Sequence, residues 1–472
     1  MNYLRRFIIP LVAVAFFFVP LMTSNEYYVH SVMAKVCVYV ILVAGLDLVV
    51  GYSGNVSVGH AGLFAVGAYT TAILMWKLDV PFPLAAIAGI ALGAAFGLLL
   101  GVPALRLSGP YLAMTTIAFG LIIQTIVNES VWLTNGSQGI RDIPLLEYGP
   151  INFEGNNLFY LVYPLMLLSL LVVHRLVTSY WGRAFEALKE STVAAECSGI
   201  SRYRYKLSAF VLSAALAGLA GALFVHIDKY IGPPTFSLQL SILFLIALIL
   251  GGTRSVLGNI IGTFIVVVLP DVFNNIAEYQ LMIFGGLLLF SLYFMPGGIA
   301  GLMRSLAARL FPAPRLATPT TEAATPEATA EREAEPRRER QAETVNPIAT
   351  RTMTGGSVST NGHALLETND LTIAFGGLVA VNKLDMRISP GEVHALIGPN
   401  GSGKSTTVNL LSGVYRPTGG RIQFAGKNIE RDPPHTISRT GISRTFQNVA
   451  LFGEMTVLEN VLVGLHHTFH GG

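Results

Sequence analysis

The stretch LIGPNGSGKST, residues 396–406, fits the pattern G-x-x-x-x-G-K-[ST] from Gly398 to Ser405. An apolar segment precedes it and a helix-favouring segment follows it. Glycines allow the backbone to wrap closely around phosphate, with successive N–H groups and a helix N-terminus facing the negative charge. Lys404 is placed to reach the β and γ phosphates, and Ser405 to coordinate magnesium. The stretch therefore predicts a phosphate-binding loop in an α/β nucleotide-binding domain.

The flanking sequence supports this prediction. Strand-like segments cover 364–375, 378–388 and 392–398, and residues 404–415 favour a helix. Residues 416–429, RPTGGRIQFAGKNI, predict another hairpin and strand. We interpret residues 363–472 as the N-terminal part of a P-loop ATPase domain.

The rest of the chain has a different composition. Hydrophobic residues make up 52% of the 472 residues and charged residues 12%, against about 25% charged in a soluble globular domain. A helix needs about 20 apolar residues to cross a bilayer, so we predict an α-helical polytopic membrane domain, residues 1–311, with about 8–10 transmembrane helices. The ten candidate segments are 7–23, 31–50, 58–76, 82–103, 111–128, 158–178, 207–227, 238–252, 256–275 and 281–303. We interpret the first as an uncleaved membrane helix, because no small-residue cleavage site follows it.

Charge sets the expected orientation of these segments. With a cytoplasmic N-terminus, only Lys77, Arg141 and Lys229 fall outside. The residues expected inside are Arg5, Arg6, Arg106, Arg175, Arg183, Lys189, Arg202, Arg204, Lys206, Arg254, Arg304 and Arg309. This asymmetry follows the positive-inside tendency. The even balance of 31 basic and 28 acidic residues argues against a nucleic-acid partner, and two cysteines are too few for a disulfide framework.

Residues 312–362 change abruptly to Pro, Ala, Thr, Glu and Arg. Such a segment buries too little apolar surface to offset the entropy of ordering, so we predict a disordered linker. About 50 flexible residues span roughly 35–42 Å. The linker can therefore hold the ATPase part beneath the membrane domain.

Two loops and one acidic residue stand out within the membrane domain. Residues 129–157 form a polar loop expected outside, either a docking surface or an ordinary solvated loop. Residues 179–206 are expected in the cytoplasm, with a short helix ending near Gly199. Asp47 lies at the inner end of a span, where it either lines a path or reaches the interface. Small residues throughout 51–72 favour close helix packing over a substrate path.

Residues from about 365 to 467 resemble the ATPase subunits of ABC transporters, in particular those of branched-chain amino acid importers. The resemblance is carried by the stretch from LTIAFGG to GKNI and by GISRTFQNVALFGEMTVLENVLVG after it. The resemblance implies that Phe375 stacks on adenine and that Gln447 forms the glutamine loop, which approaches magnesium and contacts the membrane subunit. It also implies ATP and Mg²⁺ as ligands. The ATP-binding positions are Gly398, Asn400, Gly401, Ser402, Gly403, Lys404, Ser405 and Thr406, and the Mg²⁺ positions are Ser405 and Gln447.

Residues 30–303 resemble the permease subunits of the same importers, in GYSGNVSVGHAGLFAVGAYTTA (51–72), LRLSGPYLAMTTIAFG (105–120) and TNGSQGI (134–140). Ala194, Ala195 and Gly199 match most of the family's Glu-Ala-Ala-x3-Gly coupling motif, although Val193 stands where the glutamate would be. The segment WGRAFEALKES, which contains Glu186, strengthens the match. The resemblance implies a coupling helix that fits a groove beside the ATPase glutamine loop.

These resemblances predict a permease fused to the N-terminal part of its ATPase, taking up branched-chain amino acids across a bacterial inner membrane with the ATPase part in the cytoplasm. The implied partners are a second permease subunit, a second ATPase subunit, an external substrate-binding protein and membrane lipid. Close relatives carry urea or short amides, and that alternative stays open.

Several catalytic elements of the ATPase family do not occur in this sequence. It contains no Leu-Ser-Gly-Gly-Gln signature, no apolar strand ending in Asp-Glu after the phosphate loop, and no switch histidine beyond such a strand. His466, His467 and His470 are a weak metal signal. We therefore expect impaired ATP hydrolysis by this chain alone. A nucleotide-sensing channel or transporter, a membrane-anchored P-loop kinase, and a fragment of a longer coding sequence are the alternatives.

Overall fold

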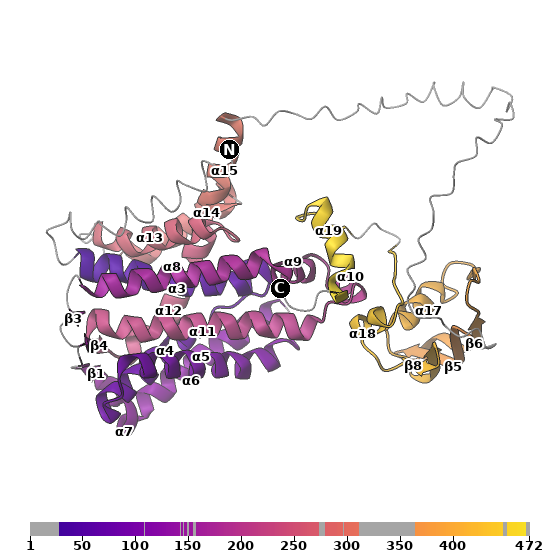
Figure 1. Ribbon diagram of the computed structural model, residues 1–472, viewed down its shortest axis with the longest axis horizontal. Coiled ribbons are helices and arrows are strands. Elements are labelled where there is room, and N and C mark those ends of the chain that lie inside the picture. The colour runs from indigo at the N-terminus through magenta and orange to yellow at the C-terminus, as the bar shows by residue number, and fades with distance from the viewer. Residues whose placement is uncertain are drawn as a thin grey trace.

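The structure is a computed structural model that describes residues 28–107, 109–141, 143–144, 146–148, 151–153, 157–272, 279–295, 297–310, 364–446 and 451–468. The predicted first span 7–23 and the predicted linker 312–362 lie outside the described residues. So does Gln447. The described chain forms a helical part and a smaller part that contains a sheet (Figure 1).

Helices dominate residues 28–310, as expected where lipid cannot satisfy backbone hydrogen bonds. In chain order they are η1 (Tyr28–Met33), α3 (Ala34–Asp47), η2 (Leu48–Tyr52), α4 (His60–Leu78), α5 (Phe82–Ala104), α6 (Pro110–Glu129), α7 (Val131–Thr134), η3 (Gly136–Gln138), α8 (Asn157–Thr178), α9 (Tyr180–Glu190), α10 (Thr192–Cys197), α11 (Arg202–Asp228), η4 (Pro233–Phe236), α12 (Leu238–Gly251), α13 (Val256–Val272), α14 (Gln280–Phe294) and α15 (Gly298–Leu310). The long helix α11 packs against α3, α4 and α5.

Nine of the ten expected segments lie wholly or mainly within the described residues. Among the described residues, six helices are long and apolar enough to cross a bilayer, or seven if the bent pair 282–294 and 298–306 forms one span. The predicted segments 238–252 and 256–275 form α12 and α13, which are apolar helices shorter than these six. The predicted span 281–303 is bent by 41° at a break after Phe294. Hydropathy alone did not reveal this break, because the residues on both sides of it are apolar.

Close helix contacts explain the small residues of 51–72. A Cβ built on Gly67 of α4 would lie 2.3 Å from the carbonyl oxygen of Gly218 in α11. A Cβ on Gly221 would lie 2.3 Å from the carbonyl oxygen of Phe64. Because the two backbones approach so closely, larger residues do not fit. The preference for a packing role over a substrate path is therefore supported.

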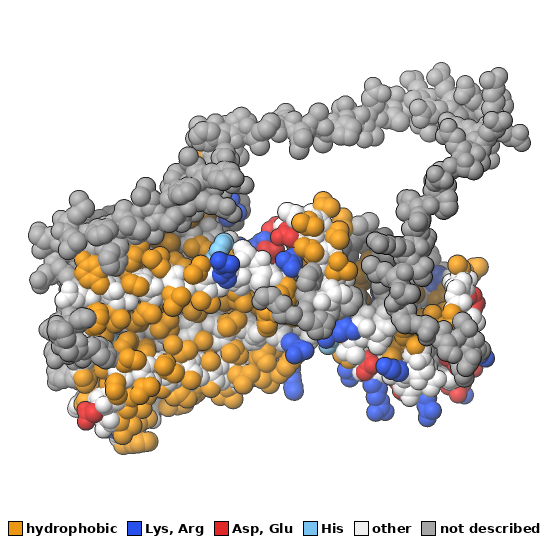
Figure 2. Space-filling view, viewed as in Figure 1, with side chains coloured by type: hydrophobic (Ala, Val, Ile, Leu, Met, Phe, Trp, Pro, Cys, Tyr) orange, Lys and Arg blue, Asp and Glu red, His pale blue; other side chains and the backbone are white. Residues whose placement is uncertain are grey.

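The outward faces of the helices carry an apolar belt (Figure 2). Its exposed side chains include Leu84, Ile87, Leu99, Met114, Ile122 and Leu168. An exposed apolar surface of this extent is expected where helices face lipid tails. The helical part is a multi-pass membrane domain.

The predicted external loop carries short elements at the end of the domain away from α9 and α10 (Figure 1). There β1 (Ile140–Arg141) pairs antiparallel with β4 (Tyr230–Ile231), and β2 (Glu147–Tyr148) pairs with β3 (Ile151–Asn152). The loop is thus tied to the end of α11.

The ATPase part contains a four-stranded sheet in the order β6-β5-β7-β8. The strands are β5 (Leu366–Phe375), β6 (Leu378–Ile388), β7 (Gly419–Phe424) and β8 (Lys427–Asn428), and each neighbouring pair is antiparallel. Helices α17 (Lys404–Leu411), α18 (Pro434–Arg439) and α19 (Val457–Gly464) and the short η6 (His466–Thr468) complete it. A core around Leu371, Ile373, Leu410 and Ile422 joins the sheet to α17. The predicted strands 364–375 and 378–388 and the hairpin within 416–429 are confirmed.

The expected strand 392–398 is not formed. Residues 392–399 carry no regular structure, and Val393 and Ile397 are 97% and 94% exposed. A strand entering a phosphate loop is stabilised by neighbouring strands and helices on both faces. No described strand pairs with this segment, so its apolar side chains face solvent.

The contact between α4 and α11 predicts the outcome of Gly67→Ala. The added methyl group meets backbone atoms, so we expect this substitution to lower the free energy of unfolding by about 1–3 kcal/mol. SDS-induced unfolding in mixed micelles measures the change. Gly285→Ala is the matched control, because a Cβ there meets nothing within 4 Å. Equal stability of both variants would contradict the packing explanation.

Candidate functional site

The phosphate loop is formed around the side chain of Lys404. Its Nζ donates hydrogen bonds to the carbonyl oxygens of Gly398 at 2.8 Å and Pro399 at 2.7 Å. Gly401 and Gly403 have φ of +86° and +85°, a region that favours glycine. The ammonium group thus lies against the loop that would surround a phosphate.

The other predicted phosphate ligands lie on or beside this loop. Asn400 and Ser402 are exposed on it, and Ser405 and Thr406 are in the first turn of α17. The backbone N–H groups of that turn have no partner within the helix, which suits anion binding. The residues present therefore fit a nucleotide phosphate chain.

Phe375 ends strand β5, and its ring is 44% exposed. It makes an edge contact with Tyr415, with ring centroids 5.3 Å apart. An exposed aromatic ring that is supported from one side can stack on a planar base. The contact of Phe375 with adenine stays a prediction.

The predicted coupling segment forms two short helices rather than one. Ser179 caps α9 by accepting a hydrogen bond from Trp181 N at 3.1 Å, and Ser191 caps α10 by accepting one from Ala194 N at 3.3 Å. Ser191 has extended backbone angles and therefore separates the helices. Gly199 follows α10 with φ of +87°, in agreement with its predicted role as a helix stop.

An apolar seam joins α9 and α10 to the end of the ATPase part. We use "coupling seam" for the buried cluster Ala184, Ala187, Leu188, Ala194, Ala195, Ile200, Phe452, Met455 and Val463. The first six belong to the permease and the last three to residues 452–463. Ala195 is fully buried and Ala194 is 4% exposed. The predicted coupling residues Ala194 and Ala195 therefore lie in a contact between the two parts, whereas Val193 is 43% exposed.

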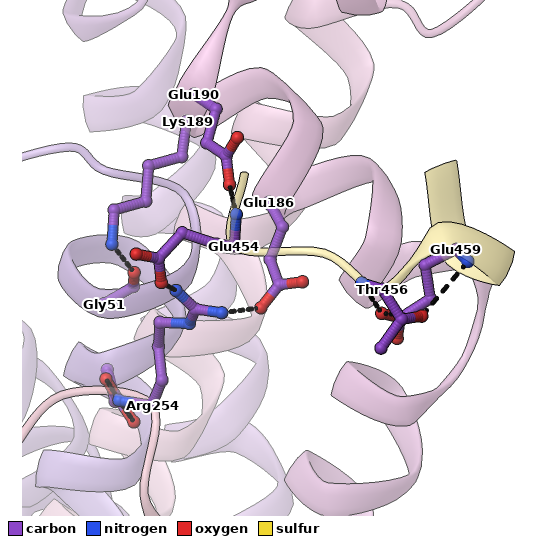
Figure 3. A network of polar contacts seen from close by, with 9 residues as sticks. Gly51, Glu186, Lys189, Glu190, Arg254, Glu454, Thr456 and Glu459 are labelled. Carbon is purple, nitrogen blue, oxygen red and sulfur yellow. Dashed lines mark hydrogen bonds and ion pairs between the residues drawn. The ribbon is translucent and has the colours of Figure 1, made fainter. Parts of the chain in front are cut away.

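Charged groups border the coupling seam (Figure 3). The Arg254 guanidinium pairs with Glu186 of α9 through Nη2, and with Glu454 of the ATPase part through Nη1 at 2.6 Å. Glu454 N also donates to Glu190 Oε1 at 2.8 Å. Burial raises the pKa of the Glu186 carboxyl, and the Arg254 charge opposes that rise. Arg254 thus contacts both α9 and the ATPase part.

The backbone of Arg254 is held by Asp47. The Asp47 carboxylate accepts hydrogen bonds from Arg254 N at 2.9 and 3.1 Å and from Asn259 Nδ2 at 3.1 Å. Asp47 is only 2% exposed. Its carboxylate therefore does not face an open path among the described residues. Instead it ties the end of α3 to the α12–α13 connection.

Three further contacts surround the seam. Tyr205 OH and His466 Nε2 are 2.7 Å apart, and Arg439 Nη2 donates to Gly199 O at 3.4 Å. Lys189 Nζ donates to Gly51 O at 2.8 Å, beside Arg254 (Figure 3). Among the described residues, no group of three or more His, Cys, Asp or Glu is arranged for a metal. His466 instead lies in the contact between the two parts.

The structure brings Glu186, Ala194, Ala195 and Gly199 to one surface that faces the ATPase part. Arg254, Glu454 and His466 were not predicted as coupling residues. Arg254 and Glu454 are 200 positions apart, and no local pattern links them. The positive-inside asymmetry did group Arg254 with the residues expected on the same side as the ATPase part, which is the one signal that pointed to it.

Comparison with known proteins defines the family of the membrane domain. Residues 28–292 match the family described as branched-chain amino acid transport system, permease component. The LivM permease protein of the high-affinity branched-chain amino acid transport system of Escherichia coli strain K12 is 36% identical over 292 residues, which cover 57% of this chain and 68% of LivM. The chain belongs to this permease family.

The C-terminal part matches the ABC transporter family over residues 381–470. The ATP-binding protein BraF of Pseudomonas aeruginosa is 51% identical over 102 residues, which cover 22% of this chain and 40% of BraF. The ATP-binding protein LivG of Escherichia coli strain K12 is 49% identical over 108 residues, which cover 23% of this chain and 42% of LivG. The chain therefore spans about two fifths of the length of these ATP-binding relatives, and it joins a permease to part of an ABC ATP-binding domain.

The charged contacts predict that Arg254→Gln weakens docking of the ATPase part. Only the Arg254–Glu454 pair crosses between the two parts, and this exposed pair is worth less than about 1 kcal/mol. The Arg254–Glu186 pair lies within the permease and orients the arginine for that contact. A protease site placed within 312–362 allows the chain to be cut, and size-exclusion chromatography then measures how much ATPase part stays with the permease. We expect less retention for Arg254→Gln than for the unsubstituted chain.

Arg304→Gln removes an exposed arginine that is also expected inside, and serves as the matched control. It should leave retention unchanged. If Arg254→Gln retained as much ATPase part as this control at every salt concentration, the ionic contact would contribute nothing to docking.

Proposed function

We propose that this chain is the permease and ATP-binding component of an ABC importer that takes up branched-chain amino acids. The coupling seam carries the proposal, because an ATP-driven importer needs a contact through which the ATPase moves the permease. The family membership of the membrane domain and the names of LivM, BraF and LivG support the substrate class.

ATP is the proposed ligand of the phosphate loop, with Mg²⁺ neutralising phosphate charge when it is bound. Lys404 would exchange the carbonyl oxygens of Gly398 and Pro399 for phosphate oxygens. Ser405 would supply a hydroxyl ligand for the metal, and Phe375 would stack on the base. Gln447 stays the proposed glutamine-loop residue.

The coupling seam gives this ligand a route to the membrane domain. Phe452, Met455 and Val463 pack against alanines of α9 and α10, so a shift of residues 451–464 displaces these two helices. Arg254 extends the contact to the α12–α13 connection and to Asp47. Movement of the ATPase part would thereby reach α3 in the membrane.

The remaining components of the transporter are also proposals. A second permease subunit would complete the path, a second ATPase subunit would pair with the ATPase part, and an external binding protein would deliver substrate. The bacterial inner membrane, with the ATPase part in the cytoplasm, is the proposed location.

The proposal predicts that Lys404→Ala abolishes ATP-driven uptake. The assembled transporter in vesicles, loaded with ATP and supplied with the binding protein and radiolabelled leucine, measures the uptake rate. Removing the phosphate-contacting lysine should lower the rate at least about a hundredfold, of the order seen when one group that stabilises transition-state charge is removed.

Lys427→Ala, which removes an exposed lysine of β8, should leave uptake unchanged. Uptake that continues at the normal rate in Lys404→Ala would favour a nucleotide-independent channel or secondary transporter. Transport of urea in place of leucine by the unsubstituted chain would refute the substrate class.

A further inference from the structure

A cavity of about 220 Å³ lies between α3, α12 and α13. Its walls are mainly aliphatic and aromatic, with Tyr39, Leu243, Phe244, Val266 and Val267 among them. At ~30 Å³ for each water-sized group, it has room for about seven such groups, the size range of a small aliphatic amino acid. The cavity is therefore large enough for more than a single trapped water.

One wall of this cavity carries an ion pair. Lys35 lines the cavity, and its Nζ lies 3.2 Å from Asp228 Oδ1 and 3.3 Å from Oδ2. The Lys35 ammonium also lies 5.7 Å from the centre of the Phe224 ring. The side chains of Lys35 and Asp228 are 29% and 37% exposed, so both charges are partly accessible. An apolar cavity lined by Lys35, with Asp228 paired to that lysine just outside the lining, matches a molecule with an apolar body and two opposite charges.

The cavity lies at the end of the membrane domain that is remote from the coupling seam. Lys35 is in the first turn of α3, whose other end carries Asp47, and Asp228 ends α11 next to β4. Leu240 is in the first turn of α12, whose last residue, Gly251, lies close to Arg254. The cavity thus lies on the side where an external binding protein would release its cargo.

We propose that this cavity is a binding site for a zwitterionic aliphatic amino acid within the permease. The substrate carboxylate pairs with Lys35, the substrate ammonium pairs with Asp228, and the branched side chain enters the cavity lined by Leu243 and Val267. The exchange leaves no charge unpaired, because the ligand carries one charge for each member of the pair. The assignment of substrate class rests on the proposed function.

Binding of radiolabelled leucine to the purified full-length chain in nanodiscs, without ATP, tests the site. Loss of a charge-assisted hydrogen bond predicts that Lys35→Met binds leucine at least about tenfold more weakly. Lys35→Arg should keep most of the affinity. Lys77→Met, which removes a lysine expected outside at the end of α4, is the matched control and should bind normally.

Competition with unlabelled analogues tests the contributions of the substrate carboxylate and the substrate ammonium separately. Leucine should displace the label, whereas 4-methylpentanoate, which lacks the amine, and isoamylamine, which lacks the carboxylate, should compete at least about tenfold less well. Equal competition by either analogue would overturn the assignment of the two charged partners.

Val267→Phe tests the cavity without touching the ion pair. The larger ring should fill the cavity and weaken binding of leucine more than binding of the smaller alanine. This change in selectivity would not be expected if Lys35 had only a structural role and the cavity held no ligand. If both Val267→Phe and a folded Lys35→Met bound leucine with normal affinity and selectivity, the site would be refuted. ATP-driven leucine uptake could then still hold, whereas normal binding without ATP-driven uptake would refute the proposed function and leave this site intact.

Discussion

The coupling seam between α9–α10 and residues 452–463 is the contact on which the joint action of the two parts depends. Burying Phe452, Met455 and Val463 contributes up to about 1.5–3 kcal/mol each. The exposed Arg254–Glu454 pair contributes less than about 1 kcal/mol. The apolar contact therefore supplies most of the docking energy, and the charged residues fix the register of the contact. Ala194 and Ala195 are buried in this contact, so we expect a larger side chain at either position to disturb it.

Arg254 joins this contact to the interior of the membrane domain. Its side chain reaches Glu186 and Glu454, while its backbone N–H donates to the buried carboxylate of Asp47. Packed elements of this kind shift as units rather than deform continuously. A movement of residues 451–464 thus has two routes into the membrane domain, one through α9 and α10 and one through the α12–α13 connection. The second route joins α3, α12 and α13, and the proposed amino-acid site lies between the opposite ends of these helices.

Local sequence patterns predicted the features that depend on near neighbours. The phosphate loop, the strand pair 366–388 and the Gly199 helix stop all follow from residues within a few positions of each other. The strand expected at 392–398 was wrong because a strand of this type needs distant neighbours, and no described strand pairs with it. The break after Phe294 was missed because hydropathy measures composition and does not detect where a helix ends. The expected segments 238–252 and 256–275, by contrast, match α12 and α13 closely. The Arg254–Glu454 contact joins residues 200 positions apart, which no local pattern reveals.

The central claim is that the coupling seam transmits the state of the ATPase part to the membrane domain. Ala195→Trp tests it most directly, with uptake of leucine and binding of ATP measured on the same assembled transporter. The account predicts that ATP binding is retained and uptake is lost, while Val193→Trp, on the exposed side of the same short helix, transports normally. Normal ATP-driven uptake by a folded Ala195→Trp variant would contradict the account.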